Sequence, residues 1–126
     1  MNAKILMLGD WVNDRSRTKY CRVTAIGNDG YVTIKRQSDG WEYQTHHNNI
    51  LPVHISPEIL EKNGFVKSRI FEEWKYEDGD VYMLWKPFPF LEVRNGGDSR
   101  ILSPCEYVHE LQHAIRLAGI NKKIVL

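Results

Sequence analysis

Turn dipeptides divide this chain into short segments that suit β-hairpins. Asp29-Gly30 separates two runs rich in β-branched and aromatic residues, 21–26 and 31–35. Asp-Gly between such runs is among the strongest hairpin signals, because the tight turn that joins two strands needs positive φ. A chain that repeats this signal is restricted to a fold with several short antiparallel strands.

Further turn signals repeat the pattern along the sequence. They are Asp39-Gly40 before 41–45, Asp78-Gly79 between 71–76 and 81–85, and Asn95-Gly96-Gly97 between 90–94 and 100–102. Four Trp and six Tyr are typical of a β-rich fold, where large rings pack at strand pairs. We therefore predict six to eight strands, mostly antiparallel, with a closing strand at 122–126.

Two helices are predicted from their end signals. Ser56 as N-cap, Pro57 at the first position and Gly64 after the last turn predict a short helix of about two turns. Ser103 as N-cap, with Glu106 completing a capping box, and Gly119 as terminator predict a longer helix over 104–118.

These elements predict a single α+β domain over residues 1–126. Residues 1–55 are expected to form an SH3-like small β-barrel subdomain. Residues 56–126 are expected to add the short helix, further antiparallel hairpins and the long C-terminal helix packed on the sheet. A chain of 126 residues has the length of one ordinary domain.

The predicted C-terminal helix carries the string His109-Glu110-Leu111-Gln112-His113, which reads H-E-x-x-H. In metalloproteases two histidines four apart on one helix face bind zinc, and the glutamate acts as general base. A third ligand would have to come from His46, His47, His54 or a carboxylate. A zinc-dependent hydrolase is therefore one hypothesis.

The apolar stripe of this helix argues against a zinc site. At about 100° per residue the stripe centres on Leu111, and both histidines lie roughly 160° away from it. We therefore expect His109 and His113 to point into solvent, and we predict no catalytic residue, no metal site and no cofactor. The pair His46-His47 is interpreted as polar residues at the end of a strand.

Basic and aromatic residues interleave in the first third of the chain. Arg22, Lys35, Arg36 and Trp41 are candidate nucleic-acid-binding residues, because single-stranded nucleic acid is bound through phosphate contacts and base stacking. The other interpretation is that the aromatic rings build a barrel core and the charges solvate its outside.

The stretch Trp85-Lys86-Pro87-Phe88-Pro89-Phe90 is apolar and interrupted by prolines. If Phe88 and Phe90 are exposed, they form with Trp85 a candidate protein-binding surface or homodimer contact. The alternative is a loop that covers the end of the core.

Charge and cysteine content limit the remaining classes. The formal net charge is +1, which gives no global attraction to nucleic acid or anionic lipid. Cys21 and Cys105 are expected to be separate buried thiols. The apolar run at residues 5–8 is far too short for a membrane span, so we expect a cytoplasmic protein without a membrane partner.

Two resemblances add expectations. The segments 9–12, 20–26 and 31–34 are similar to the start of SH3-like barrels of the KOW type, which implies a small barrel that binds RNA or ribosomal and transcription proteins. The glycine-rich basic loop of that motif is missing, with only Gly27 and Gly30 present.

The whole chain resembles an uncharacterised family of small proteins from gut anaerobic bacteria, their mobile elements and their phages. The segments 9–12, 55–65 and 107–113 carry this resemblance. It implies that the histidine and glutamate positions of the last segment vary, and it implies no activity.

We therefore expect a non-enzymatic accessory or interaction protein of a mobile element or phage. Its partner would be another protein or a second copy of itself. Nucleic-acid binding by the small barrel is the alternative, and zinc-dependent hydrolysis is the second alternative.

Overall fold

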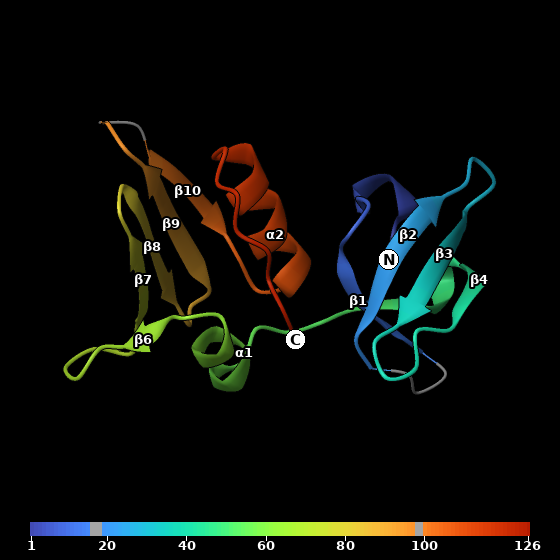
Figure 1. The fold of residues 1–126 in the computed structure, drawn as a ribbon, viewed down its shortest axis with the longest axis horizontal. Helices are drawn as coiled ribbons and strands as arrows, with labels where there is room; N and C mark the ends of the chain where they lie inside the picture. The colour runs from blue at the N-terminus through green and yellow to red at the C-terminus, as the bar shows by residue number, and fades with distance from the viewer. Residues whose placement is uncertain (16–18, 98–99) are drawn as a thin grey trace. The chain divides into compact units, whose positions relative to one another are not determined.

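A computed structural model describes residues 1–15, 19–97 and 100–126. The chain divides into two compact units, Met1–Val53 and His54–Leu126, and each is described by itself (Figure 1).

The first unit is a five-stranded antiparallel sheet with strand order β4-β3-β2-β1-β5. Its elements are η1 (Ala3–Ile5), β1 (Trp11–Asp14), β2 (Cys21–Ile26), β3 (Tyr31–Arg36), β4 (Glu42–His46), η2 (His47–Asn49) and β5 (Ile50–Pro52). Strands β1 to β4 follow one another as a meander, and β5 returns to pair with β1. The hairpins predicted around Asp29-Gly30 and Asp39-Gly40 are confirmed.

Alternation along the strands builds the core of this unit. Val23 on β2 and Ile34 on β3 are directly opposite each other and are almost fully buried. The buried cluster comprises Leu6, Val12, Cys21, Val23, Val32, Ile34 and Ile50. The hydroxyl of Tyr43 donates a hydrogen bond to the buried carboxylate of Asp14 at the edge of the cluster. We expected an SH3-like small β-barrel, and within the described residues no ladder joins the edge strands β4 and β5 to close one.

The second unit combines another five-stranded antiparallel sheet with two helices. Its elements are α1 (Pro57–Lys62), β6 (Val66–Lys67), β7 (Trp74–Asp78), β8 (Val81–Lys86), β9 (Phe90–Asn95), β10 (Arg100–Pro104) and α2 (Val108–Leu117). The strand order β10-β9-β8-β7-β6 is a simple meander, in which each strand pairs with the next one along the chain. The predicted hairpins at Asp78-Gly79 and Asn95-Gly96-Gly97 are confirmed, and the ten strands of the described residues exceed the predicted number.

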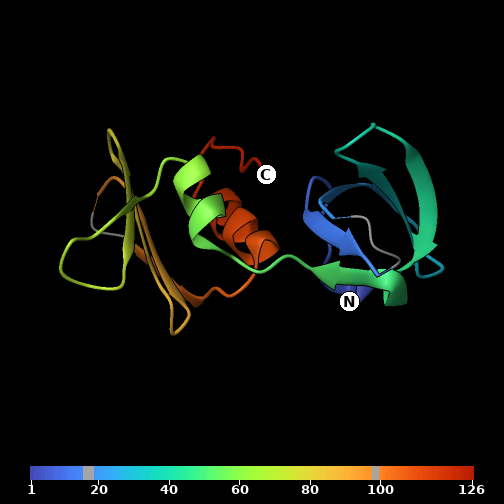
Figure 2. The same cartoon turned by 90° about the horizontal axis from the view of Figure 1, so that it is seen from below.

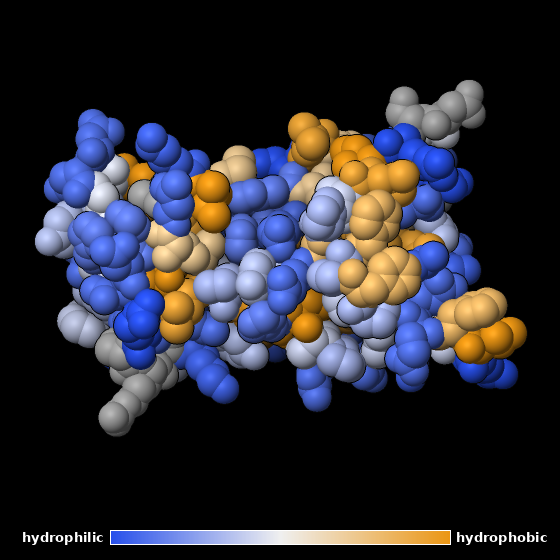
Figure 3. Space-filling view, turned by 180° about the vertical axis from the view of Figure 1, so that it is seen from behind, coloured by the Kyte–Doolittle hydropathy of each residue, from blue (hydrophilic) through white to orange (hydrophobic). Residues whose placement is uncertain are grey.

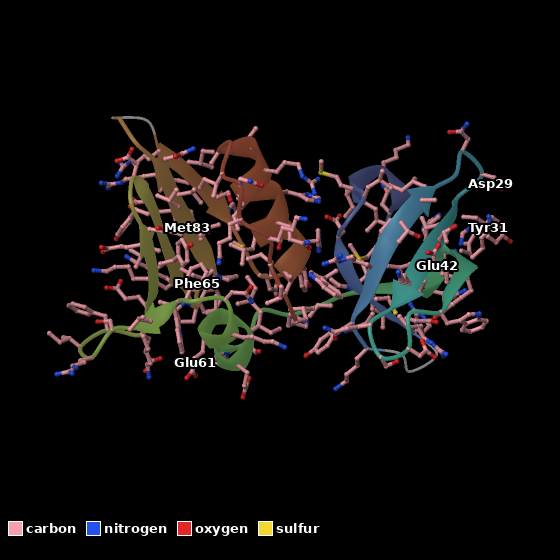
Figure 4. All side chains as sticks on the ribbon, in the orientation of Figure 1. Asp29, Tyr31, Glu42, Glu61, Phe65 and Met83 are labelled. Carbon is pink, nitrogen blue, oxygen red and sulfur yellow. The ribbon has the colours of Figure 1, made fainter. Side chains whose placement is uncertain are left out.

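The helices lie against one face of this sheet, as Figures 1 and 2 show. The side chains between helix and sheet are buried: Leu60, Phe65, Met83, Leu91, Val93, Val108, Leu111 and Ile115. Met83 on β8 and Phe65 after α1 are labelled in Figure 4 on the side of the sheet where the helices lie. The described residues are therefore α+β, and none of their helices is long and apolar enough to cross a bilayer.

Helix α1 has the ends that its sequence predicts. The hydroxyl of Ser56 accepts a hydrogen bond from the Ile59 amide, and Pro57 is the first helical residue. Gly64 follows the C-cap with φ of 87°, a conformation that costs glycine little. The amides of Gly64 and Phe65 then reach back to the last carbonyls of the helix, as in a Schellman motif.

The predicted start of α2 is wrong. Ser103 and Pro104 belong to strand β10, where they pair with Leu91 and Phe90, and the helix begins at Val108 with Tyr107 as N-cap. Pairing with β9 is a contact between distant residues, which a local capping signal cannot reveal. Gly119 does follow the last turn with φ of 71°, as predicted.

The predicted closing strand at 122–126 is also wrong, because no ladder among the described residues includes it. The buried side chain of Asn63 takes the place of a neighbouring strand: its amide donates to the Val125 carbonyl and accepts from the Val125 amide, both at 2.8 Å. Ile124 and Leu126 are buried on either side. One polar side chain therefore fixes the C-terminal segment on the unit.

Candidate functional site

The histidine pair of α2 does not point into solvent as predicted. His109 is 5% exposed and His113 is half-buried. The ring of His109 stacks on Tyr107 at 5.7 Å between centroids, and His113 meets it edge-on at 5.5 Å. The expectation was wrong because it considered only the apolar stripe, whereas an aromatic ring just before the helix covers His109.

The string H-E-x-x-H is not joined by a third ligand in the part of the chain that the structure describes. No group of three or more His, Cys, Asp or Glu side chains there could hold a metal ion. His54 extends the ring contacts instead, with its centroid 4.9 Å from that of Tyr107. His46 and His47 lie in the first unit, where their rings are 4.3 Å apart at the end of β4.

Glu110, the general base of the zinc hypothesis, has a structural role at the helix start. Its Oε1 accepts hydrogen bonds from the backbone amides of Glu106 and Tyr107, both at 3.0 Å. A glutamate at the third helical position that reaches back to the N-cap amide is one half of a capping box. The carboxylate therefore stabilises the first turn of α2.

The candidate nucleic-acid-binding residues fall into two groups. Arg36 and Trp41 form the first, since the guanidinium lies 4.7 Å above the Trp41 ring. Trp41, 56% exposed, also stacks on Tyr43 with centroids 4.7 Å apart. Arg36 is paired with Asp39, and this hydrogen bond lowers the pKa of the Asp39 carboxyl and raises the pKa of Arg36.

Arg22 and Lys35 form the second group, directly opposite each other on β2 and β3. Arg22 lies over the ring of Trp11 at 4.7 Å, and Lys35 on β3 is directly opposite Glu42 on β4. Glu42 is labelled on this strand in Figure 4. Successive residues of a strand point to opposite faces, so Lys35 and Arg36 are on different sides of the sheet. The four candidate residues therefore do not form one continuous nucleic-acid-binding surface.

The candidate protein-binding residues Trp85, Phe88 and Phe90 are also separated. Trp85 is 8% exposed, and its indole nitrogen donates to the carbonyl of Cys105 at 2.8 Å. It is a core residue, because β8 turns it toward the helices together with Met83. Phe88 is 74% exposed in the turn between β8 and β9, and Phe90 is half-buried at the start of β9.

Both cysteines are free and buried, as predicted. Burial raises the pKa of the Cys105 thiol to about 12 and also raises the pKa of Cys21. A thiol held neutral in this way is a poor nucleophile.

The face of the second sheet turned away from the helices is the largest feature that sequence reasoning missed. Alternation places Leu84 and Tyr82 of β8 on this outer face, opposite in direction to the buried Met83 and Trp85. Strand register then defines a first row across all five strands: Val66, Lys75, Leu84, Glu92 and Leu102. It also defines a second row across four strands: Glu77, Tyr82, Arg94 and Arg100.

Apolar side chains on and beside the outer face are open to solvent. Val66 is 70% exposed and Leu102 46%, while Ile70 and Phe71 in the loop between β6 and β7 are 83% and 63% exposed. Figure 3 shows hydrophobic groups on the surface of the second unit, one of them on this projecting loop. The alternation within β8 could have indicated two apolar faces, but not which one the helices cover.

Charges on the outer face pair with one another within one chain, both along strands and between β9 and β10, where Arg100 lies 3.4 Å from Glu92. Lys75 lies 3.5 Å from Glu77, and Arg94 lies 3.2 Å from Glu92. A shallow pocket of about 420 Å³ opens where β6, β7 and β8 meet, with Val66 and Leu84 in its lining. The face thus combines exposed apolar groups with charges of both signs.

Comparison of the chain with protein families, with curated proteins and with solved structures finds no match.

Proposed function

We propose that this chain is a non-enzymatic interaction protein that binds protein through the outer face of its second sheet. One observation carries the proposal: a five-stranded sheet is buried on one face, while its other face carries apolar side chains in contact with solvent. Antiparallel sheets commonly expose a polar second face. Exposed apolar groups gathered on one surface and bordered by charges mark sites of protein association.

Phe88 and Phe90 belong to this surface. Phe90 alternates with the buried Leu91 and therefore points to the outer side of β9. Phe88 lies next to it in the turn, with the Lys86 ammonium 5.8 Å from the centre of its ring. Aromatic side chains are enriched where proteins bind each other, because they bury a large area with little loss of conformational freedom.

The non-enzymatic part of the proposal is supported by what H-E-x-x-H does in the fold. Its glutamate caps α2, and its first histidine is packed beneath Tyr107. These contacts give Glu110 and His109 structural roles at the start of the helix.

Photo-cross-linking in producing cells tests the proposal. A benzophenone amino acid at position 88 should give a protein adduct of defined mass. The matched control is the same amino acid at position 117, because Leu117 is 77% exposed at the end of α2 and is not part of the outer face. No adduct at position 88, or equal adducts at both positions, would refute the proposal.

For the first unit we infer an SH3-like small barrel, which the return of β5 to β1 supports. Nucleic-acid binding by this unit is the second candidate function, favoured by one observation: Trp41 is 56% exposed and lies beside the Arg36 guanidinium, a pairing of ring and cation that single-stranded nucleic-acid sites use. We expect the protein to be retained on single-stranded nucleic acid at low salt and more weakly at higher salt. Trp41→Ala should not be retained. Equal retention of Trp41→Ala and wild type would exclude this site.

A further inference from the structure

We propose that the partner bound by the outer face is a second copy of this chain, related by a two-fold axis that runs parallel to β8. This inference rests on the proposed function, since it uses the same face. It adds the identity of the occupant and the direction in which the two sheets meet.

The order of side chains in the first row is the basis of the inference. Across the five strands the row reads apolar, positive, apolar, negative, apolar, with Leu84 of β8 at its centre. Lys75 lies one strand to one side of Leu84, and Glu92 lies one strand to the other side. The charges on the two sides of the central strand are therefore opposite.

A two-fold axis along β8, in the plane between two facing sheets, exchanges the two sides of the strand. It brings Lys75 of each copy opposite Glu92 of the other and places the two Leu84 side chains against each other. The same rotation sets Val66 against Leu102. Facing sheets pack about 10 Å apart, a separation that Lys and Glu side chains can span from the two sides.

The second row shows the same arrangement of opposite charges on the two sides of the central strand. Glu77 and Arg94 lie on the two sides of Tyr82, again with opposite charges. The axis that pairs Lys75 with Glu92 also pairs Glu77 with Arg94. Two rows therefore give four ion pairs between the copies, and residue i contacts residue j while j contacts i, as an isologous interface requires.

The charge pattern also excludes one other arrangement of the two copies. A two-fold axis perpendicular to the strands and above the first row would set each side chain of that row against its own copy. Lys75 would then face Lys75, and Glu92 would face Glu92, an arrangement of like charges that opposes association. An axis perpendicular to the strands and midway between the rows would instead set Lys75 against Glu77 and Glu92 against Arg94. The two arrangements differ in the mixture of charge-reversed variants described below, which regains opposite charges at every pair only with the axis parallel to β8.

The ion pairs already present within one chain fit this arrangement. They run along the strands from Lys75 to Glu77 and from Glu92 to Arg94, and across the β9–β10 pair from Arg100 to Glu92, so a second copy adds a further partner to each charge of the four proposed pairs. Lys86 lies on β8, close to the axis, so the Lys86 side chains of the two copies would approach each other. Its ammonium is 3.9 Å from the Glu73 carboxylate, which compensates the positive charge.

The size of the face is consistent with a weak to moderate dimer. Five strands about 4.8 Å apart and three outward rows about 6.8 Å apart, the third carrying Lys86 and Phe90, give an interface on the order of 1,000 Å² in total for two copies. This area is at the lower limit for specific association. Complementary charges at such an interface mainly determine which partner and which orientation are accepted.

Two charge reversals test the inference by sedimentation equilibrium at concentrations up to about 1 mM. Wild type should show dimers. Lys75→Glu and Glu92→Lys should each raise the dimer dissociation constant at least about tenfold, because each places like charges opposite each other twice. A one-to-one mixture of the two variants should dimerise again, because every opposing pair in the mixed dimer has opposite charges.

Lys123→Glu is the matched control, an exposed lysine of the same unit outside both rows, and it should dimerise like wild type. Circular dichroism confirms that each variant is folded. A strictly monomeric wild type, a dimer unaffected by the reversals, or a mixture that stays monomeric would each overturn the inference. If the wild type is monomeric but position 88 still cross-links to a different protein in cells, the inference that the partner is a second copy is wrong. The proposed protein-binding function is then still supported.

Discussion

Replacing Glu110 tests whether this residue is a helix cap or a catalytic base. In Glu110→Ala the amides of Glu106 and Tyr107 lose their common acceptor, Oε1 at 3.0 Å from each nitrogen. Loss of a capping side chain costs about 0.5–2 kcal/mol. The Glu106 amide is in an exposed position where water replaces the acceptor, whereas the Tyr107 amide is partly buried. We expect the free energy of unfolding to fall by about 1–2 kcal/mol.

The informative comparison is with Glu110→Gln. Glutamine at this position can still accept both hydrogen bonds, because its side-chain oxygen replaces a carboxylate oxygen in the capping box. We expect Glu110→Gln to lose no more than about 0.5 kcal/mol, and the exposed control Glu61→Ala to change as little. A catalytic base would be lost equally in both Glu110 variants.

Urea unfolding followed by circular dichroism at 222 nm measures these differences. The order of stability should be wild type, then Glu110→Gln, then Glu110→Ala. If Glu110→Ala were as stable as wild type, or if both variants were equally destabilised, the assignment of Glu110 as a capping residue would be refuted.

Three further predictions concern the second unit. Asn63→Ala should lower the free energy of unfolding by about 2–4 kcal/mol, because the hydrogen bonds of a buried side-chain amide are lost. Hydrogen exchange at the Val125 amide should become faster, and unchanged exchange would contradict the role of Asn63 in holding the C-terminal segment. Trp85→Phe should cost about 1–3 kcal/mol, whereas Phe88→Ala should stay within about 0.5 kcal/mol, and equal losses in urea unfolding would argue against a core Trp85. The pKa of the Cys105 thiol is raised from the ordinary value of 9.0 to about 12 in the folded protein. Below pH 9 the free energy of unfolding is therefore unaffected by this group, and between pH 9 and about 12 it falls as pH rises, because only the unfolded chain releases the proton. Between about pH 9 and 10 wild type should lose up to about 1.4 kcal/mol more than Cys105→Ala, and parallel unfolding curves of the two would contradict it.

The features that could be predicted from the sequence are those determined by neighbouring residues. Asp29-Gly30 and Asp78-Gly79 specify tight turns by local backbone geometry, and both hairpins are present. The caps of α1 are similarly local, because Ser56 and Gly64 contact atoms no more than a few residues away. These signals do not depend on the rest of the fold.

The features that could not be predicted depend on distant contacts. Ser103 and Pro104 suit a helix start, but pairing with β9 holds them in a strand and moves the helix start to Val108. Asn63 could not be identified as the partner of Val125, because 62 residues separate them. His109 is covered by Tyr107, a contact that the count of apolar residues on the helix does not include.

The candidate surface was only partly accessible to sequence reasoning for the same reason. The apolar stretch around Phe88 was visible, but β8 is apolar on both faces, and only the position of the helices decides that Trp85 is inside and Leu84 outside. The charge order across the first row depends on the register of four strand pairs. No single stretch of the sequence contains that order.

Disulfide trapping at position 88 tests most directly whether two copies meet along β8. The turn that carries Phe88 joins β8 to β9 and therefore lies close to the proposed axis, and the native cysteines are buried. Mild oxidation of Phe88→Cys should give a covalent dimer of twice 14.8 kDa, whereas Leu117→Cys, equally exposed, should remain monomeric. A monomeric Phe88→Cys chain, or equal dimer yields from the two variants, would contradict the account.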